Sequence, residues 1–440
     1  MVLTALLVLA AAVTIFGLVR YWPDAEKRAD SVSTTEFAAP GVTFPIATVT
    51  RVLPVCPGNA GEVGATPAPG QPGEVVEEGT TCGAITVRLD EGAAAGTTLS
   101  VSVPPAITDS GLQTDDKVQL MRVPPQEGAA EAYSFLQVQR GAPLTIMAIL
   151  FLVVVAVVAR VRGLLALLGL VIGGFVVIAF MLPALLEGES GLVVAAVGSS
   201  AIMFVVLYLA HGLSIRTSTA LAGTLFGVAI TAVLGILAGD AARLSGVAND
   251  EAATLASFVQ HMSPKELLTA AIIVAGLGVL NDVTITQSSA VWELRAAAPH
   301  LTRMDLFRSG MRIGRDHIAS TIYTIVFAYA GAALPVLMLL FLYERPVLEL
   351  LQTESLAEEI VRTLASAIGL VLAVPATTAI AALTVSGAQA RLGRPQAPRP
   401  PAPTGGSRPA PTRPAPTGPG APAPSGPPTT RAEARARRRT

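Results

Sequence analysis

The sequence predicts an all-α polytopic membrane bundle of about eight transmembrane helices, with a small extracytoplasmic β-barrel-like domain. Apolar residue types make up 52% of the 440 residues and charged types only 14%, which a soluble domain does not normally show. Long apolar runs supply the crossings, because a hydrocarbon core about 30 Å thick requires about 20 apolar residues per helix. Between the first two runs lies a stretch of short alternating segments that predicts strands.

Eight segments meet or approach the length needed for a crossing. They are residues 2–19, 142–159, 164–186, 192–210, 219–238, 267–287, 318–342 and 356–385. We therefore expect an N-terminal transmembrane helix at 1–20 and a seven-helix transmembrane domain at 141–386.

Charges in the loops predict the orientation, because Lys and Arg concentrate in short cytoplasmic loops. The loops that carry Arg160 and Arg162, Arg216, and the arginines between residues 295 and 315 all fall on one side of the predicted membrane. The loop that carries Glu187 and Glu189 falls on the other side. This alternation places residues 40–140 outside the cytoplasm and the C-terminal tail inside. The basic residues after the first span oppose that assignment locally, but the later loops agree with one another.

Residues 40–140 predict a compact β domain of the OB or SH3 kind. Its expected strands are residues 46–53, 84–89, 97–103, 117–123 and 133–139, and 57–73 is a Gly/Pro-rich insertion. In an oxidising exterior, Cys56 and Cys82 are expected to form a disulfide, and two free thiols are the alternative.

Residues 395–440 form a Pro-rich basic tail that is expected to be disordered and cytoplasmic. We expect the lipid bilayer as the principal partner and no nucleic acid, and leave open a homo-oligomer or an envelope partner. The three lysines lie in no G-K-[ST] motif, and the four histidines and the serines form no zinc or hydrolase motif. Hence no catalytic residue, metal or cofactor is predicted, and we expect a protein that is not an enzyme.

One predicted helix carries unusual polarity into the membrane. Asp282, Thr286, Ser289 and Glu293 share one face at 100° per residue. A second face carries Asn281, Thr284 and Ser288, while the next predicted helix aligns Arg312, Asp316 and Ser320. We expect the two helices to face each other around a hydrated site, because ionisable groups inside a membrane face protein or water. The candidate solute or ion pathway comprises Asn281, Asp282, Thr284, Thr286, Gln287, Ser288, Ser289, Glu293, Arg312, Arg315, Asp316, His317 and Ser320.

A structural role explains the same residues without any solute. Ser and Thr hydrogen-bond neighbouring helices in lipid, and an Asp–Arg pair at a helix end can fix the turn between two spans. Both interpretations stay open from the sequence.

The chain resembles the YibE/F-like family of bacterial multipass membrane proteins. The resemblance rests on residues 277–294 (LGVLNDVTITQSSAVWEL), 314–321 (GRDHIAST) and 328–331 (AYAG), and extends over most of 140–386. It implies a bacterial cytoplasmic-membrane protein with several spans, described as permease-like, and it implies no substrate. We therefore expect a transporter for a small solute or ion. A membrane scaffold or envelope sensor is the alternative, and an enzyme using Asp282, Asp316 or His317 ranks last.

Overall fold

A computed structural model describes residues 1–24, 41–54, 83–92, 94–125, 131–259, 262–342 and 346–385. The predicted insertion at 57–73, the tail at 395–440 and both cysteines lie outside these ranges.

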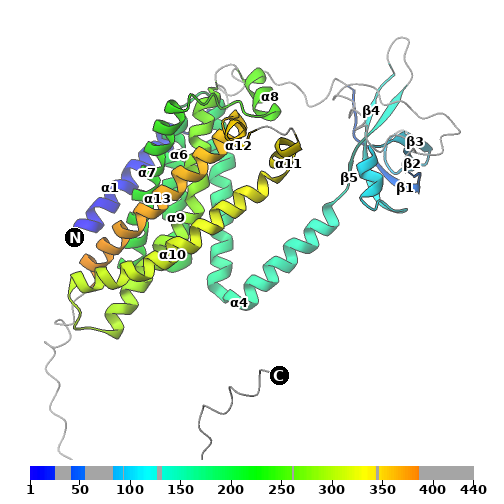
Figure 1. The fold of residues 1–440 in the computed structure, drawn as a ribbon. Coiled ribbons are helices and arrows are strands. Elements are labelled where there is room, and N and C mark those ends of the chain that lie inside the picture. Colours follow the sequence, from blue (N-terminus) through cyan, green and yellow to red (C-terminus); the bar gives the residue numbers. More distant parts are fainter. Residues whose placement is uncertain are drawn as a thin grey trace, which may run out of the picture. The chain divides into compact units, whose positions relative to one another are not determined.

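The five predicted strands are present in the described part of the β domain. They are β1 (Ile46–Val52), β2 (Ala84–Leu89), β3 (Thr98–Ser102), β4 (Lys117–Val123) and β5 (Ala132–Val138). All pairs are antiparallel, in the order β3-β2-β1-β4-β5 (Figure 1). Contacts between the two edge strands curl the sheet, and a short helix, α3 (Pro105–Asp109), follows β3.

Alternation along the strands builds the core of this domain. Val49, Ile85, Val87, Val118 and Leu120 are completely buried, because successive side chains of a strand point to opposite faces. The extracytoplasmic placement and the OB or SH3 class remain predictions.

Long helices make up the rest of the described chain. They are α1 (Val2–Arg20), α4 (Gly141–Val176), the π-helical turn η1 (Val177–Met181), α5 (Leu182–Leu186), α6 (Gly191–His211), α7 (Ile215–Ala241), α8 (Asp250–Phe258), α9 (Pro264–Ala297), α10 (Arg303–Ala332), α11 (Leu334–Leu342), α12 (Val347–Leu350) and α13 (Glu354–Thr384).

Six helical segments in the described residues are long and apolar enough to cross a membrane, compared with the eight stretches that the sequence predicts. Two predicted spans are joined in Gly141–Leu186, where Arg160 breaks the helix with φ 54° and ψ −142°. The predicted span at 318–342 is divided between α10 and α11, and the polar first half of α10 lowers its hydropathy. The structure therefore supports several membrane spans and leaves the exact number of eight unconfirmed.

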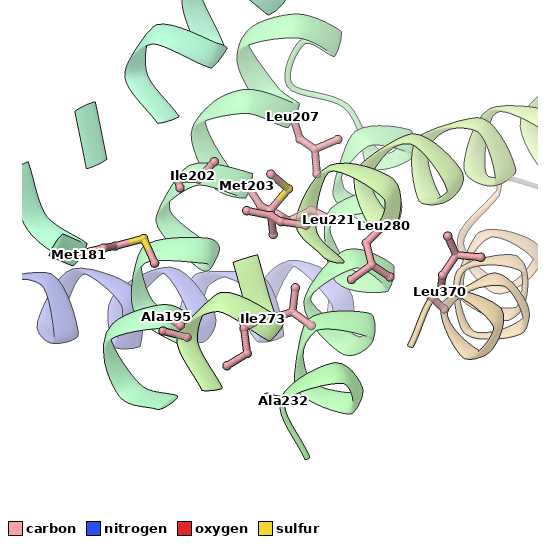
Figure 2. Packing of buried hydrophobic residues seen from close by; sticks show 14 of the residues in the cluster. Met181, Ala195, Ile202, Met203, Leu207, Leu221, Ala232, Ile273, Leu280 and Leu370 are labelled. Atoms are coloured by element: carbon pink, nitrogen blue, oxygen red, sulfur yellow. The ribbon is translucent and has the colours of Figure 1, made fainter. Parts of the chain in front are cut away.

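Helices α7, α9 and α13 pack against one another in the centre of the bundle. Helix α6 lies against α7 and α9, α10 lies against α9 and α13, and α1 contacts α6 and α7 (Figure 1). The apolar core between them includes Leu221, Ile273, Leu280 and Leu370 (Figure 2), each completely buried.

The two ends of the bundle differ in charge. At one end, the Glu266 carboxylate accepts from Gly191 N at 2.6 Å, Lys265 pairs with Asp240, and Glu354 accepts from Ser245 N; we call this the acidic end. At the opposite end, Ser288 Oγ donates to Arg216 O at 2.8 Å. This basic end also carries His211, which lies near Arg162 and near Arg216.

A capping box begins α10 at the basic end. Thr302 Oγ1 accepts from Asp305 N at 3.2 Å, and the Asp305 carboxylate accepts from Thr302 Oγ1 at 2.6 Å and from Thr302 N. The Thr302 hydroxyl, through this hydrogen bond, holds the pKa of Asp305 below its usual value of 3.8.

Candidate functional site

Helix α9 sorts its predicted site residues onto two faces. Asp282, Thr286 and Glu293 are exposed and Ser289 is half-buried, and we call these four residues the outer stripe of α9. The shared face predicted from the sequence is present, but it points away from the packed helices. No hydrogen bond or ion pair involves the side chains of the outer stripe within the described residues.

Gln287 is the polar residue that joins three helices. It is only 1% exposed, and its Nε2 donates to Gly310 O on α10 at 2.8 Å and to Thr378 Oγ1 on α13 at 2.7 Å. The Thr378 hydroxyl in turn donates to Val374 O at 2.7 Å. These bonds support the structural interpretation of this residue, since amide groups hydrogen-bond across helices in membranes.

Two hydroxyls of α9 bind α7. Thr284 Oγ1 lies 2.6 Å from Thr224 Oγ1, and Ser288 Oγ bonds Arg216 O. Asn281 is half-buried, with its Oδ1 buried and without a partner in the described chain. The inward-facing polar side chains of α9 therefore contact α7 as well as α10.

The predicted residues of α10 mostly lie at the surface. Arg312, Arg315, Asp316 and Ser320 are exposed, and His317 is half-buried with an unpartnered Nε2. The described structure shows no pairing of their charges with the outer stripe of α9. The opposite charges expected to face each other are therefore not paired within the described residues, and the hydrated site stays a prediction.

A buried polar cluster that the sequence did not single out lies between α7, α9 and α13. Thr231 is completely buried and Ser366 is 3% exposed, and neither hydroxyl oxygen has a partner among the described residues. Both side chains converge on Gly276, where a Cβ would lie 3.2 Å from Ser366 Oγ and 3.6 Å from Thr231 Cγ2. On the other side, a Cβ on Gly369 would collide with Thr231 Oγ1.

A second unpartnered hydroxyl lies further along α13. Thr377 is completely buried, its Oγ1 has no partner in the described ranges, and it occupies the space that a Cβ on Gly223 would need. The sequence signal for this contact was the Gly223/Gly227 spacing on α7. Small residues at such a spacing let helix backbones approach closely.

A cavity of about 260 Å³ opens at the acidic end, on the acidic-end side of the cluster formed by Thr231 and Ser366. Its lining includes Asp240, Lys265 and Glu266, and its deeper walls include Gly235 and Ile272. Gly235 lies four residues from Thr231, and Ile272 lies four residues from Gly276, so about 6 Å along the helix axes separates these two levels.

A buried carboxylate lies on α13 at the same end. Glu358 is 7% exposed, one interaction comes from the backbone of Gly246, and its Oε1 has no partner in the part of the chain described. Glu358, Arg362 and Ser366 follow one another at intervals of four residues, which places them on one face of α13. The described residues contain no cluster of three His, Cys, Asp or Glu side chains that could hold a metal.

Comparison with known proteins gives one assignment. The family model for YibE/F-like protein matches residues 147–387. The chain belongs to the YibE/F-like family. Searches of curated proteins and of solved structures found no significant match.

For this YibE/F-like protein, the matched region contains every helix that forms the buried polar cluster. The family resemblance inferred from residues 277–331 is thereby confirmed. The β domain lies before the matched region, so the family assignment carries no statement about it.

Proposed function

We propose that this YibE/F-like membrane protein transports a small polar solute, and that an inorganic cation is the class its acidic end favours. The observation that carries the proposal is a series of buried polar atoms between α7 and α13 that have no hydrogen-bond partner in the part of the chain that the structure describes. Thr231 Oγ1, Ser366 Oγ and Thr377 Oγ1 belong to this series. A buried polar group without a protein partner favours a bound water or ligand, because leaving it unsatisfied costs about 1–3 kcal/mol.

The arrangement resembles a route entered from the acidic end. The cavity bounded by Asp240 and Glu266 reaches Gly235, and the hydroxyls of Thr231 and Ser366 follow one turn deeper. Hydroxyl and carbonyl oxygens are the ligands that hard cations prefer. Carboxylates around an entrance raise the local concentration of cations.

Close packing separates the two hydroxyl levels. Thr377 against Gly223 and Thr231 against Gly369 leave no space for a side-chain carbon. Transport therefore requires α7 to move relative to α13, and the small side chains at their contact allow such a movement with little steric interference.

The proposal includes an orientation in the bacterial cytoplasmic membrane. Arg162 and Arg216 at one end and Glu187, Glu189 and Glu266 at the other follow the rule that basic loops stay in the cytoplasm. The cavity at the acidic end then opens to the exterior, and the C-terminal tail lies inside.

Purified protein in liposomes tests transport directly. Uptake of protons, Na⁺ and K⁺ is followed with ion-sensitive dyes for the unmodified protein and for Thr231→Val, which keeps the shape of the side chain and removes its hydroxyl. We expect uptake of one of these ions by the unmodified protein and at least a tenfold slower rate in the variant.

The matched control is Thr324→Val on α10, because Thr324 is exposed and bonds only its own helix. Its uptake should equal that of the unmodified protein. Absence of uptake of all three ions by folded protein, or equal rates for Thr231→Val and Thr324→Val, would contradict the proposed route.

A non-transporting scaffold or sensor is the second candidate, and the tight α7–α13 contact is the observation that favours it. In that case Thr231→Val changes the thermal stability of the bundle and the liposomes stay impermeable to all three ions.

A further inference from the structure

The exposed polar face of α9 lies inside the depth that the bundle spans. Helix α6 has 21 residues, about 32 Å at 1.5 Å per residue, which just crosses a hydrocarbon core. Its first residue, Gly191, contacts Glu266 near the start of α9. A parallel crossing of the same length therefore carries α9 to about residue 286.

A contact at the other end also places Asp282 inside the bundle. The Ser288–Arg216 hydrogen bond marks the level at which α7 begins. Asp282 precedes Ser288 by six residues, so it lies about 9 Å deeper in the bundle. Asp282 thus exposes a carboxylate at a depth where lipid offers no hydrogen bonds, and Thr286 follows it at the edge of that depth.

Neither lipid nor the loosely packed first half of α4 would satisfy this face. Residues 141–159, which precede the break at Arg160, are exposed or half-buried throughout, and Thr145 is their only polar side chain. The Thr145 hydroxyl already donates to Gly141 O at 2.7 Å. A helix of this composition laid on the outer stripe of α9 would leave Asp282 without a partner.

Positive charge lies at a matching depth on α10. Gln287 bonds Gly310 O, and a Cβ on Gly314 would lie 3.1 Å from the Gln287 amide, so the segment between these glycines is level with Gln287. Arg312 lies within that segment, and Arg315 lies one residue deeper. Because α10 runs antiparallel to α9, Arg315 approaches the level of Asp282.

We infer that the outer stripe of α9 is the interface of a two-fold symmetric homodimer, in which Asp282 of each copy pairs with Arg315 of the other. A two-fold axis along the membrane normal preserves depth, so groups that are level within one copy are level across the interface. The face is self-complementary, since it offers the Asp282 carboxylate on α9 and the Arg315 guanidinium on α10 at similar depths. Pairing removes the cost of an isolated charge in the membrane.

Site-specific photocrosslinking in intact membranes tests the interface. A photoreactive amino acid replaces Thr286 in one variant and Val233 in the control, because Val233 is 54% exposed on α7 and belongs to no polar stripe. We expect a crosslinked species of twice the chain mass at position 286 and none at 233. A crosslink from 286 to a different protein, or no crosslink from 286 at all, overturns the inference.

Charge exchange tests the pairing itself. Single-molecule photobleaching in bilayers measures the dimer fraction of Asp282→Arg, of Arg315→Asp and of the double variant. Each single exchange should weaken association at least about tenfold, and the double exchange should restore it, because opposite charges again meet. Undiminished association of folded single variants, or no recovery in the double variant, rejects the pairing.

Discussion

Replacing Gly223 by Ala should separate α7 from α13. Real Cβ atoms essentially never come closer than 3.0 Å to another heavy atom, and the added Cβ would lie well within that distance of Thr377 Oγ1. It would also lie 3.3 Å from Thr377 Cγ2. One other χ1 rotamer of Thr377 exchanges the hydroxyl for the methyl group, and the rotamer that turns Hβ toward the new carbon still leaves Thr377 Cβ at 3.0 Å from it. Since overpacking a close contact costs about 1–3 kcal/mol, we expect a loss near the upper value.

The same substitution at Gly239 is the matched control. Gly239 lies on the same helix, and nothing lies within 4 Å of the Cβ position there. Ala at this position should be neutral or should stabilise the helix by about 0.5–1 kcal/mol, because Gly has the greater conformational entropy when unfolded.

Unfolding in mixed detergent micelles, followed by circular dichroism, gives the free-energy differences. The double variant Gly223→Ala/Thr377→Ala should recover most of the lost stability, because the hydroxyl and methyl group that collide with the new Cβ are removed. Equal stability of Gly223→Ala and Gly239→Ala would show that α7 and α13 do not pack as described.

Three further regions give predictions of their own. Gln287→Leu keeps the side-chain volume but loses two hydrogen bonds, so unfolding in micelles should show a loss of about 1–2 kcal/mol; an unchanged value refutes the bridging role. Cys56 and Cys82 should resist alkylation in denatured, non-reduced protein, and quantitative labelling of both excludes the disulfide. A single cysteine at Gly111 should react with an impermeant reagent in intact cells, and labelling only after lysis would reverse the orientation. Because the pKa of Asp305 is lowered on folding, its contribution to stability should be present above pH 3.8 and disappear as the pH falls through the folded pKa; Asp305→Asn should lack this pH dependence in acid titrations followed by circular dichroism.

Local patterns predicted the β domain well. Each expected strand is present within one residue at either end, for example 46–53 against β1 (Ile46–Val52), because period-2 alternation and turn residues act over a few positions. Apolar runs in the sequence predicted most of the long helices equally well. The sequence separated spans 142–159 and 164–186 at the position where Arg160 breaks the helix, but the number of spans was harder to predict, because α10 is only half apolar and the span expected at 318–342 is divided between α10 and α11.

The candidate site was predicted in part. Periodicity placed Asp282 and Thr286 on one face, but a helical period cannot tell which face meets protein and which meets the surroundings. Gln287 was named without its partners on α10 and α13. Thr231 and Ser366 were missed, because single hydroxyls on apolar helices are common and only tertiary packing shows that these two have no partner among the described residues.

The break at Arg160 separates the first half of α4 from the helices that pack tightly. Residues 141–159 are about 28 Å long as a helix, nearly the full thickness of an average hydrocarbon core. A thicker bilayer leaves this segment no spare length, whereas a thinner one is matched when the segment tilts. The left-handed backbone at Arg160 is the point about which it can tilt without disturbing α6. We therefore expect this half-helix to respond to membrane thickness separately from the core of the bundle.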